Sequence, residues 1–292
     1  VSRTRLCPIY RFRSGNTVSA TQWEEAMADA ERWLGERKVS LNRGDLGFGH
    51  DAIMAWHEAA PARPKFLFKL KLTTLVRSAL HRLKDSDWQG PATLGACQIA
   101  EARIQLTGWK ASRRVIFART LQGVVPAADR ADFWDQHKHE FAVYVTNLPE
   151  DVNGWQIQEL YRQRADTENV FDELKNQWGF SGFCAKSRAT TELAARLLLM
   201  VYNLWTLFVR FIVPQKHTEA KRGRRWFLLI AARLVQSGRQ KEVQVSISGG
   251  WAQQLRDGYL RLHEWIRTTA PQLKCIVPEP PSPTGSPAQA GA

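Results

Sequence analysis

Cysteine is scarce and scattered in this 292-residue sequence. Its four cysteines, Cys7, Cys97, Cys184 and Cys275, form no CxxC pair. This spacing excludes the usual zinc-binding and disulfide-framework patterns and fits a reducing compartment. Long apolar runs are missing as well: Leu197–Val209, the most apolar stretch, is uncharged for only thirteen residues, whereas a membrane span needs about 20. We therefore expect a buried helix there, no membrane partner, and a cytoplasmic location.

Acidic residues are too few to balance the basic ones. The chain has 41 Lys and Arg against 28 Asp and Glu, a net charge of +13 and a pI near 9.9. This surplus predicts a polyanionic partner, most simply nucleic acid, with an anionic membrane surface as the alternative. The membrane alternative is the weaker one, because no predicted helix shows a basic face opposite a wide apolar face.

The first 84 residues alternate between strand and helix patterns, which predicts an α/β fold with a parallel or mixed sheet. We expect strands at 1–14, 38–42 and 64–72 and helices at 21–37, 51–60 and 73–84. Thr21, with Glu24 three residues later, has the pattern of a capping box for the first of these helices.

Residues 85–150 hold short β-like runs and predict a β-rich insertion in the α/β unit. Helix patterns follow at 153–178, 190–213, 224–237 and 250–268. The Pro-, Ser- and Gly-rich stretch 277–292 predicts a disordered tail. The basic cluster Lys221–Arg225 lies between two of these helices and is equally suited to clamping a DNA backbone or to a solvated loop.

The helix pattern at 153–178 carries a polar stripe of Tyr161, Arg164, Glu168 and Lys175. At about 100° per residue, these four side chains point within roughly 60° of one another. One interpretation is a surface helix with ordinary charge pairs, Arg164 and Glu168 being spaced i,i+4. The other is a site that combines a carboxylate with groups able to hold phosphate.

Asp45 is the second carboxylate of interest. It follows a predicted strand and is flanked by Gly44 and Gly47, which allow close approach of backbone and ligand. The alternative is a turn or helix-capping aspartate. Together with Glu168 in a strongly basic chain, Asp45 would suit phosphoryl transfer on nucleic acid, in which carboxylates clamp two divalent ions.

Three segments carry a family resemblance. The spacing Y-x₂-R-x₃-E-x₆-K over Tyr161–Lys175 resembles the Y-R-E-K signature of DDE-class bacterial insertion-sequence transposases. RGDLGF at Arg43–Phe48 resembles the segment around that family's second catalytic Asp, and RSGNT at Arg13–Thr17 resembles the strand end that precedes it.

The resemblance implies a ribonuclease-H-like mixed sheet with helices, a β-rich insertion and a helical C-terminal region. It implies metal-dependent strand cleavage and strand transfer on double-stranded DNA, at terminal inverted repeats and target DNA, by a homodimer in the bacterial nucleoid. Three carboxylates would hold two Mg²⁺ or Mn²⁺ ions, with Asp45 and Glu168 as the second and third catalytic ligands. Tyr161, Arg164 and Lys175 would bind the terminal phosphate and DNA strand.

One departure concerns the family's first Asp, which belongs on an earlier strand. Before Asp45 the sequence holds only one other Asp, Asp29, which lies in a predicted helix. With Val1 as the first residue, we expect an N-terminally truncated transposase that is inactive in strand cleavage by itself. The alternatives are a non-catalytic DNA-binding remnant and another ribonuclease-H-like nuclease.

The expected domains follow from these patterns. They are an incomplete ribonuclease-H-like core (1–84), the β-rich insertion (85–150), the rest of the core with the Y-R-E-K helix (151–213), a helical region (214–276) and the tail (277–292).

Overall fold

The computed structural model of the chain describes residues 4–11, 17, 20–125, 136–183, 186–245 and 251–269. The chain forms two compact units, Val1–Asn203 and Leu204–Ala292. Several sequence predictions fall outside the described residues: most of the RSGNT segment, Cys184, Cys275 and the tail at 277–292. The predicted strand at 1–14 is not formed by its described part, residues 4–11.

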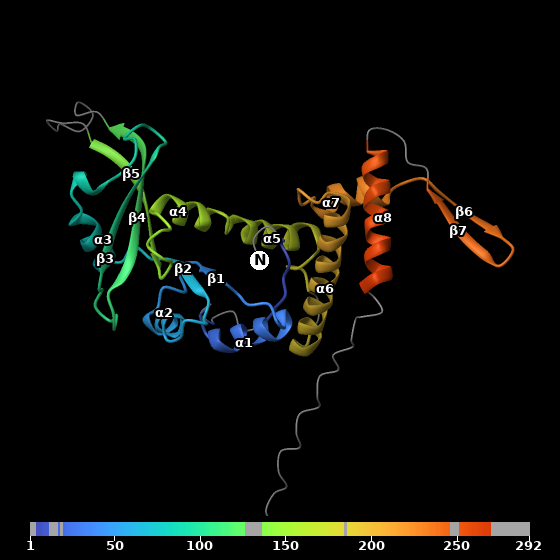
Figure 1. Cartoon of the computed structure of the whole chain (residues 1–292), viewed down its shortest axis with the longest axis horizontal. Helices are drawn as coiled ribbons and strands as arrows, with labels where there is room; N and C mark the ends of the chain where they lie inside the picture. The colour runs from blue at the N-terminus through green and yellow to red at the C-terminus, as the bar shows by residue number, and fades with distance from the viewer. Residues whose placement is uncertain are drawn as a thin grey trace, which may run out of the picture. The chain divides into compact units, whose positions relative to one another are not determined.

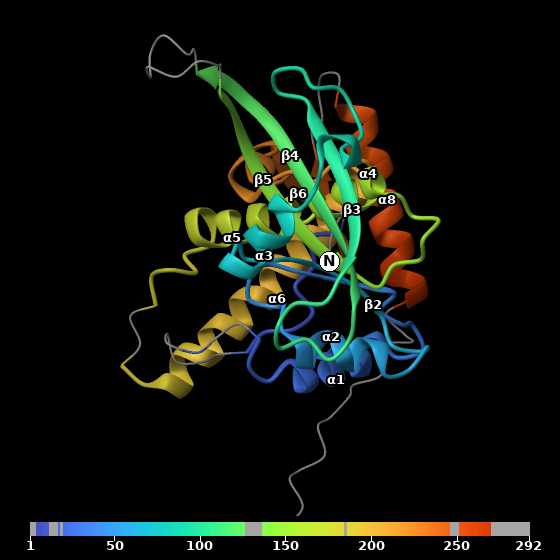
Figure 2. The ribbon, with the colours of Figure 1, turned by 90° about the vertical axis from the view of Figure 1, so that its left-hand side faces the viewer.

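The first unit is built on one five-stranded mixed sheet (Figure 1). Its strands are β1 (Leu41–Gly44), β2 (Lys65–Lys69), β3 (Cys97–Ile104), β4 (Arg113–Val125) and β5 (Gln136–Thr146). The order is β1-β2-β5-β4-β3; β1 and β2 are parallel and every other pair is antiparallel. The β-rich stretch after residue 85 therefore extends the same sheet, and Figure 2 shows its long β4–β5 ribbon.

Strand β2 explains why the sheet is covered on both faces. Phe66 and Phe68 are fully buried against α2 (Asp51–Glu58) and α3 (Thr74–His81), while Leu67 between them is buried on the other face with Ile157 of α4 (Gly154–Arg162). Side chains alternate across a strand, so a strand covered on both faces is apolar throughout. The strand predicted at 64–72 forms as the shorter β2, with a lysine at each end.

The helix caps follow the sequence in part. Thr73 caps α3, its hydroxyl accepting a hydrogen bond from the Val76 N–H at 3.4 Å. The prediction that Thr21 caps α1 (Trp23–Leu34) is wrong. The residue before that helix is Gln22, in a left-handed conformation with φ of 60°, and no side chain caps the first turn.

His57 on α2 is buried among aromatic rings. Its Nδ1 lies 2.7 Å from the Pro64 carbonyl oxygen, and its Nε2 has no hydrogen-bond partner among the described residues. Burial lowers the pKa of His57 from the ordinary value of 6.5. The ring is therefore neutral in the folded chain at neutral pH.

The free energy of unfolding should fall as the pH drops below about 6.5, because the unfolded chain then binds a proton that the folded His57 still excludes. Denaturant titrations at pH 7.5 and 5.5 should show this loss in the wild type and a smaller one in His57→Gln. The exposed His81→Gln serves as the control. Equal losses in all three proteins would contradict this account of His57.

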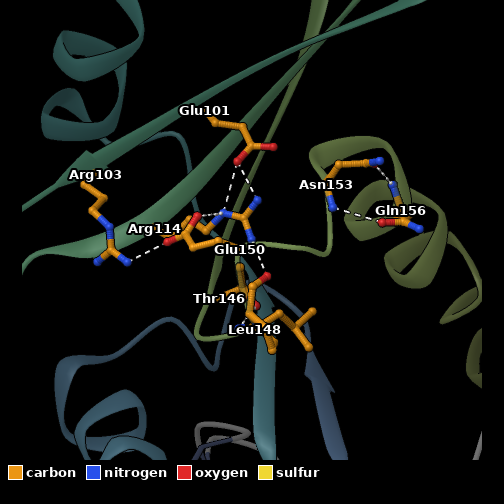
Figure 3. A network of polar contacts seen from close by, with 9 residues as sticks. Glu101, Arg103, Arg114, Thr146, Leu148, Glu150, Asn153 and Gln156 are labelled. Atoms are coloured by element: carbon orange, nitrogen blue, oxygen red, sulfur yellow. Dashed lines mark hydrogen bonds and ion pairs between the residues drawn. The ribbon is translucent and has the colours of Figure 1, made fainter.

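Arg114 anchors the connection between the sheet and α4. Its guanidinium, 6% exposed, bonds the Glu101 carboxylate at 2.6 Å and the Pro149 carbonyl oxygen at 2.9 Å (Figure 3). Asn153 then caps α4 with Gln156 completing the capping box, as its position in the sequence predicts. The start of the Tyr161 helix is therefore fixed to β3 and β4.

The predicted single helix at 153–178 is two helices, α4 and α5 (Ala165–Gln177), which follow one another almost end to end in Figure 1. Between them Arg164 N–H bonds the Tyr161 carbonyl at 2.8 Å and Thr167 N–H bonds the Arg164 carbonyl at 2.8 Å. Each of these bonds joins residues three positions apart, as in a 3₁₀ helix, whereas the bonds of an α-helix join residues four positions apart. Tyr161 therefore belongs to one helix, and Glu168 and Lys175 to the next.

Helix α6 (Arg188–Ile212) confirms the predicted apolar helix and is longer than its uncharged run. Among the described residues it alone is long and apolar enough to cross a membrane by length and composition. Its fully buried Tyr202 packs with Val170 and Leu174 of α5. The stretch 197–209, predicted to be a buried helix, is buried on one face only, because four of its apolar side chains are about half exposed: Leu197, Met200, Val201 and Leu204.

One of the helices predicted in the second unit does not form. The prediction at 224–237 is wrong, because only a π-helical turn, η3 (Arg224–Leu228), forms there and the chain then enters a hairpin of β6 (Ala232–Ser237) and β7 (Gln240–Val245). Gly238, with φ of 60°, makes the hairpin turn. The other elements are α7 (Ala220–Gly223) and α8 (Ala252–Thr269).

Candidate active site

Asp45 lies directly after β1, and its two carboxylate oxygens have different partners. Oδ1 accepts a hydrogen bond from the Gly47 N–H at 3.1 Å, and Oδ2 lies 3.3 Å from Nη2 of Arg164. The first contact is the turn role that the sequence allowed. The second leaves an oxygen directed at the helix that carries Glu168.

Gly44 has a packing role beside Asp45. A Cβ at Gly44 would lie 2.6 Å from Cβ of Phe48, closer than real contacts allow. Phe48 also packs against Trp23, with ring centroids 5.7 Å apart. The space over Gly44 is therefore filled by the chain itself, and the glycine holds the Asp45 turn in place.

Arg164 joins the two candidate catalytic carboxylates. Its Nη1 lies 2.6 Å from Oε1 of Glu168 and its Nη2 3.3 Å from Oδ2 of Asp45. The Arg164 side chain is 20% exposed, Asp45 45% and Glu168 67%. The structure therefore brings Asp45, Arg164 and Glu168 together at the β1 end of the sheet, although 119 positions separate the first two.

Tyr161 borders the same cluster from α4. Its ring centroid lies 4.7 Å from that of Tyr144 on β5. Burial raises the pKa of the Tyr161 phenol, and the charges of Asp45 and Glu168 raise it further while Arg164 lowers it. Tyr161 therefore keeps its proton at neutral pH and can donate a hydrogen bond. Burial likewise raises the pKa of Tyr144 to about 12.

Lys175 lies apart from this cluster. It is exposed on α5, seven residues after Glu168, and makes no ion pair among the described residues. A helix rises about 1.5 Å per residue, so seven residues place Lys175 roughly 10 Å along α5 from Glu168. It extends the polar stripe toward solvent.

Three further charged residues surround the cluster and were not singled out as site residues from the sequence. Arg43 donates to the Leu160 carbonyl oxygen, and burial lowers its pKa. Arg5 pairs with Asp166 at 3.4 Å. The RGDLGF motif contains Arg43, but only the fold shows that it ties β1 to the end of α4.

No group of three or more His, Cys, Asp or Glu side chains forms a ready metal site within the part of the chain that the structure describes. Asp45 and Glu168 are two carboxylates neutralised by one guanidinium. Mg²⁺ commonly binds one or two protein carboxylates and takes its remaining oxygens from water and substrate. The donor set is thus chemically suited to one such ion, in exchange for the Arg164 contacts.

A mixed α/β sheet covered by helices, in a strongly basic chain, is consistent with a ribonuclease-H-like DNA-processing domain. A family model described as "Transposase DDE domain group 1" matches residues 7–266. Because the match covers most of the sequence, the chain belongs to this family of DDE-class transposases. No curated protein matches it.

Proposed function

We propose that this chain carries part of the catalytic centre of an insertion-sequence transposase, which cuts DNA at terminal inverted repeats and joins it to target DNA. The observation that carries the proposal is the convergence of Asp45 and Glu168 on Arg164. A solvated helix with local charge pairs would need only the contact between Arg164 and Glu168. The contact with Asp45 crosses from a strand end to the helix.

In this proposal Asp45 and Glu168 hold Mg²⁺ or Mn²⁺, and the complete site holds two ions. When bound, such ions supply charge stabilisation and an activated water or hydroxyl for in-line displacement at phosphorus. The two side chains are exposed enough to exchange one partner for another.

The other residues of the cluster position DNA. Arg164, freed from the carboxylates, has the planar fork that binds a phosphate with two hydrogen bonds. Tyr161 keeps its phenolic proton and donates to a second phosphate oxygen. Lys175, farther along α5, contacts the strand beyond the cut as a point charge. Two copies of the chain would assemble on paired DNA ends in the bacterial nucleoid.

The remaining carboxylate of a complete DDE site, the family's first Asp, is not among the described residues near this pair. In the described part of the chain, no strand pairs with the outer edge of β1. A parallel strand added there would end beside Asp45, because the carboxyl ends of parallel strands meet at one sheet edge. We propose that the first Asp lies on such a strand. Without it the chain should not nick DNA in Mn²⁺, and a non-catalytic DNA-binding remnant is the second candidate function.

Manganese binding tests the paired site. Asp45→Asn and Glu168→Gln should each weaken Mn²⁺ binding by about tenfold or more. Mutating residues that only support a metal ligand already lowers metal affinity by about tenfold, so removing a ligand should cost at least as much. If both carboxylates hold one ion, the double variant should lose less than the two single losses combined. Asp172→Asn, an exposed carboxylate on the same helix, is the control.

Independent losses in the double variant would mean two unrelated weak sites. Mn²⁺ binding unchanged in all variants would contradict the metal assignment, and Mn²⁺-dependent nicking by the unaltered chain would contradict the prediction that its site is incomplete. Isothermal titration and the electron paramagnetic resonance of free Mn²⁺ both measure this binding.

A further inference from the structure

The second unit carries a cluster of cations and tryptophans. Lys221, Arg222, Arg225 and Trp226 line an open depression on its surface. The Arg222 guanidinium lies 3.9 Å from the centre of the Trp226 ring system. Trp226 also lies beside Trp251, with ring centroids 5.4 Å apart and ring planes at 38°. These five residues are called the Trp226 platform below.

Both tryptophans of the platform are unusually accessible for their size. Trp226 is 39% exposed and Trp251 is 46% exposed, whereas large aromatic side chains are mostly buried. The three cations beside them are exposed as well. No carboxylate is among the described residues that line the depression, so its charge is uniformly positive.

A tightly packed framework holds the platform in place. A Cβ at Gly223 would lie 2.4 Å from the Trp205 ring, so the chain presses directly on that ring. Phe227 is 1% exposed, and its carbonyl oxygen accepts a hydrogen bond from the Tyr259 hydroxyl at 2.7 Å. The intervening π-helical turn, a feature often found at functional sites, turns Arg225 and Trp226 to the surface.

Trp88 and Trp109 of the first unit are less suited to receive a base. Trp88 packs against Phe141, with ring centroids 6.5 Å apart. Each is half-buried and has no second exposed tryptophan in ring contact among the described residues.

We infer that the Trp226 platform binds single-stranded DNA, with unpaired bases stacking on Trp226 and Trp251 and adjacent phosphates held by Lys221, Arg222 and Arg225. Aromatic side chains beside a cationic groove are the general means of binding unpaired strands without sequence preference. Arginine planes add to such a stack. This inference rests on the proposed function for its partner, DNA, but it concerns a surface separate in sequence from Asp45 and Glu168.

Fluorescence anisotropy with a labelled oligothymidylate of about 16 nucleotides, within the usual range for such sites, tests the platform. Trp226→Ala should weaken binding about tenfold, Trp251→Ala by a similar factor, and Trp226→Phe much less, since a ring remains to stack on. Arg225→Gln should reduce the slope of log binding constant against log salt concentration by about 0.7, because one phosphate contact on a single strand is lost. Trp226→Ala should leave that slope unchanged.

Matched controls lie in the first unit. Trp33, 69% exposed on α1, and Arg32 beside it are changed to Ala and Gln. Oligothymidylate binding that falls equally in Trp33→Ala and Trp226→Ala would overturn the inference. Equal losses of oligothymidylate affinity in Trp226→Phe and Trp226→Ala would also overturn it. A Trp226→Ala variant that changed only the mass of the protein in sedimentation, and not its DNA binding, would overturn it too and would make the surface an interface between copies of the chain. The Mn²⁺ titration of Asp45 and Glu168 variants fails or succeeds independently of these results.

Discussion

Arg113→Met is expected to lower the free energy of unfolding by about 3 kcal/mol, the cost of removing one partner from a buried charge cluster. The Arg113 side chain is 2% exposed, and its guanidinium bonds Asp51 at 2.6 Å and Glu58 through two contacts at 2.8 and 2.9 Å. Its loss leaves two carboxylates facing an apolar replacement. The lower end of the usual range applies because Glu58 is 31% exposed.

Urea denaturation of the whole chain at neutral pH measures this loss. Arg103→Met is the matched control, because Arg103 pairs with Glu150 on an open surface where both side chains are about two-thirds exposed. That pair should contribute little. Equal destabilisation by the two substitutions would show that the Arg113 cluster does not hold α2 to the sheet.

Arg164→Gln is expected to change metal and DNA binding in opposite directions. Mn²⁺ binding should tighten roughly fivefold, because two partly exposed ion pairs no longer compete for Asp45 and Glu168. DNA binding should weaken and lose about one unit of its salt dependence, the contribution of one phosphate contact on duplex DNA. Titrations of Mn²⁺ and of a labelled duplex measure the two effects.

Arg162→Gln, an exposed neighbour at the end of α4, should weaken DNA binding at most slightly and leave Mn²⁺ binding unchanged. If Arg164→Gln weakened Mn²⁺ binding instead, its guanidinium would be supporting the two carboxylates rather than competing with the ion. The account of Arg164 as a cation exchanged for metal would then be wrong.

Motif spacing predicted the residues that meet at the site better than it predicted their helix. The sequence places Asp45 at a strand end and Glu168 on a helix, and Arg164 touches both. The break between α4 and α5 has no local signal, because Gln163 and Arg164 are good helix formers. Tertiary contacts decide it: Arg43 bonds the Leu160 carbonyl and Arg5 pairs with Asp166.

In the second unit, local sequence patterns predicted the wrong secondary structure. The helix prediction at 224–237 followed the helical spacing of the apolar residues after Arg224. It gave no weight to Gly238, which turns the chain back as a hairpin. The meeting of Trp226 with Trp251 is non-local, and no spacing rule finds it. Strand β2, by contrast, was predictable because burial on both faces leaves an unbroken apolar run.

Anomalous diffraction at the manganese absorption edge, from crystals of the chain grown with Mn²⁺, tests the central claim most directly. The account predicts a peak bonded to carboxylate oxygens of both Asp45 and Glu168, with Arg164 displaced from at least one of them. Crystals that show Mn²⁺ bound elsewhere, or no peak and Arg164 still bridging both carboxylates at saturating Mn²⁺, would contradict it.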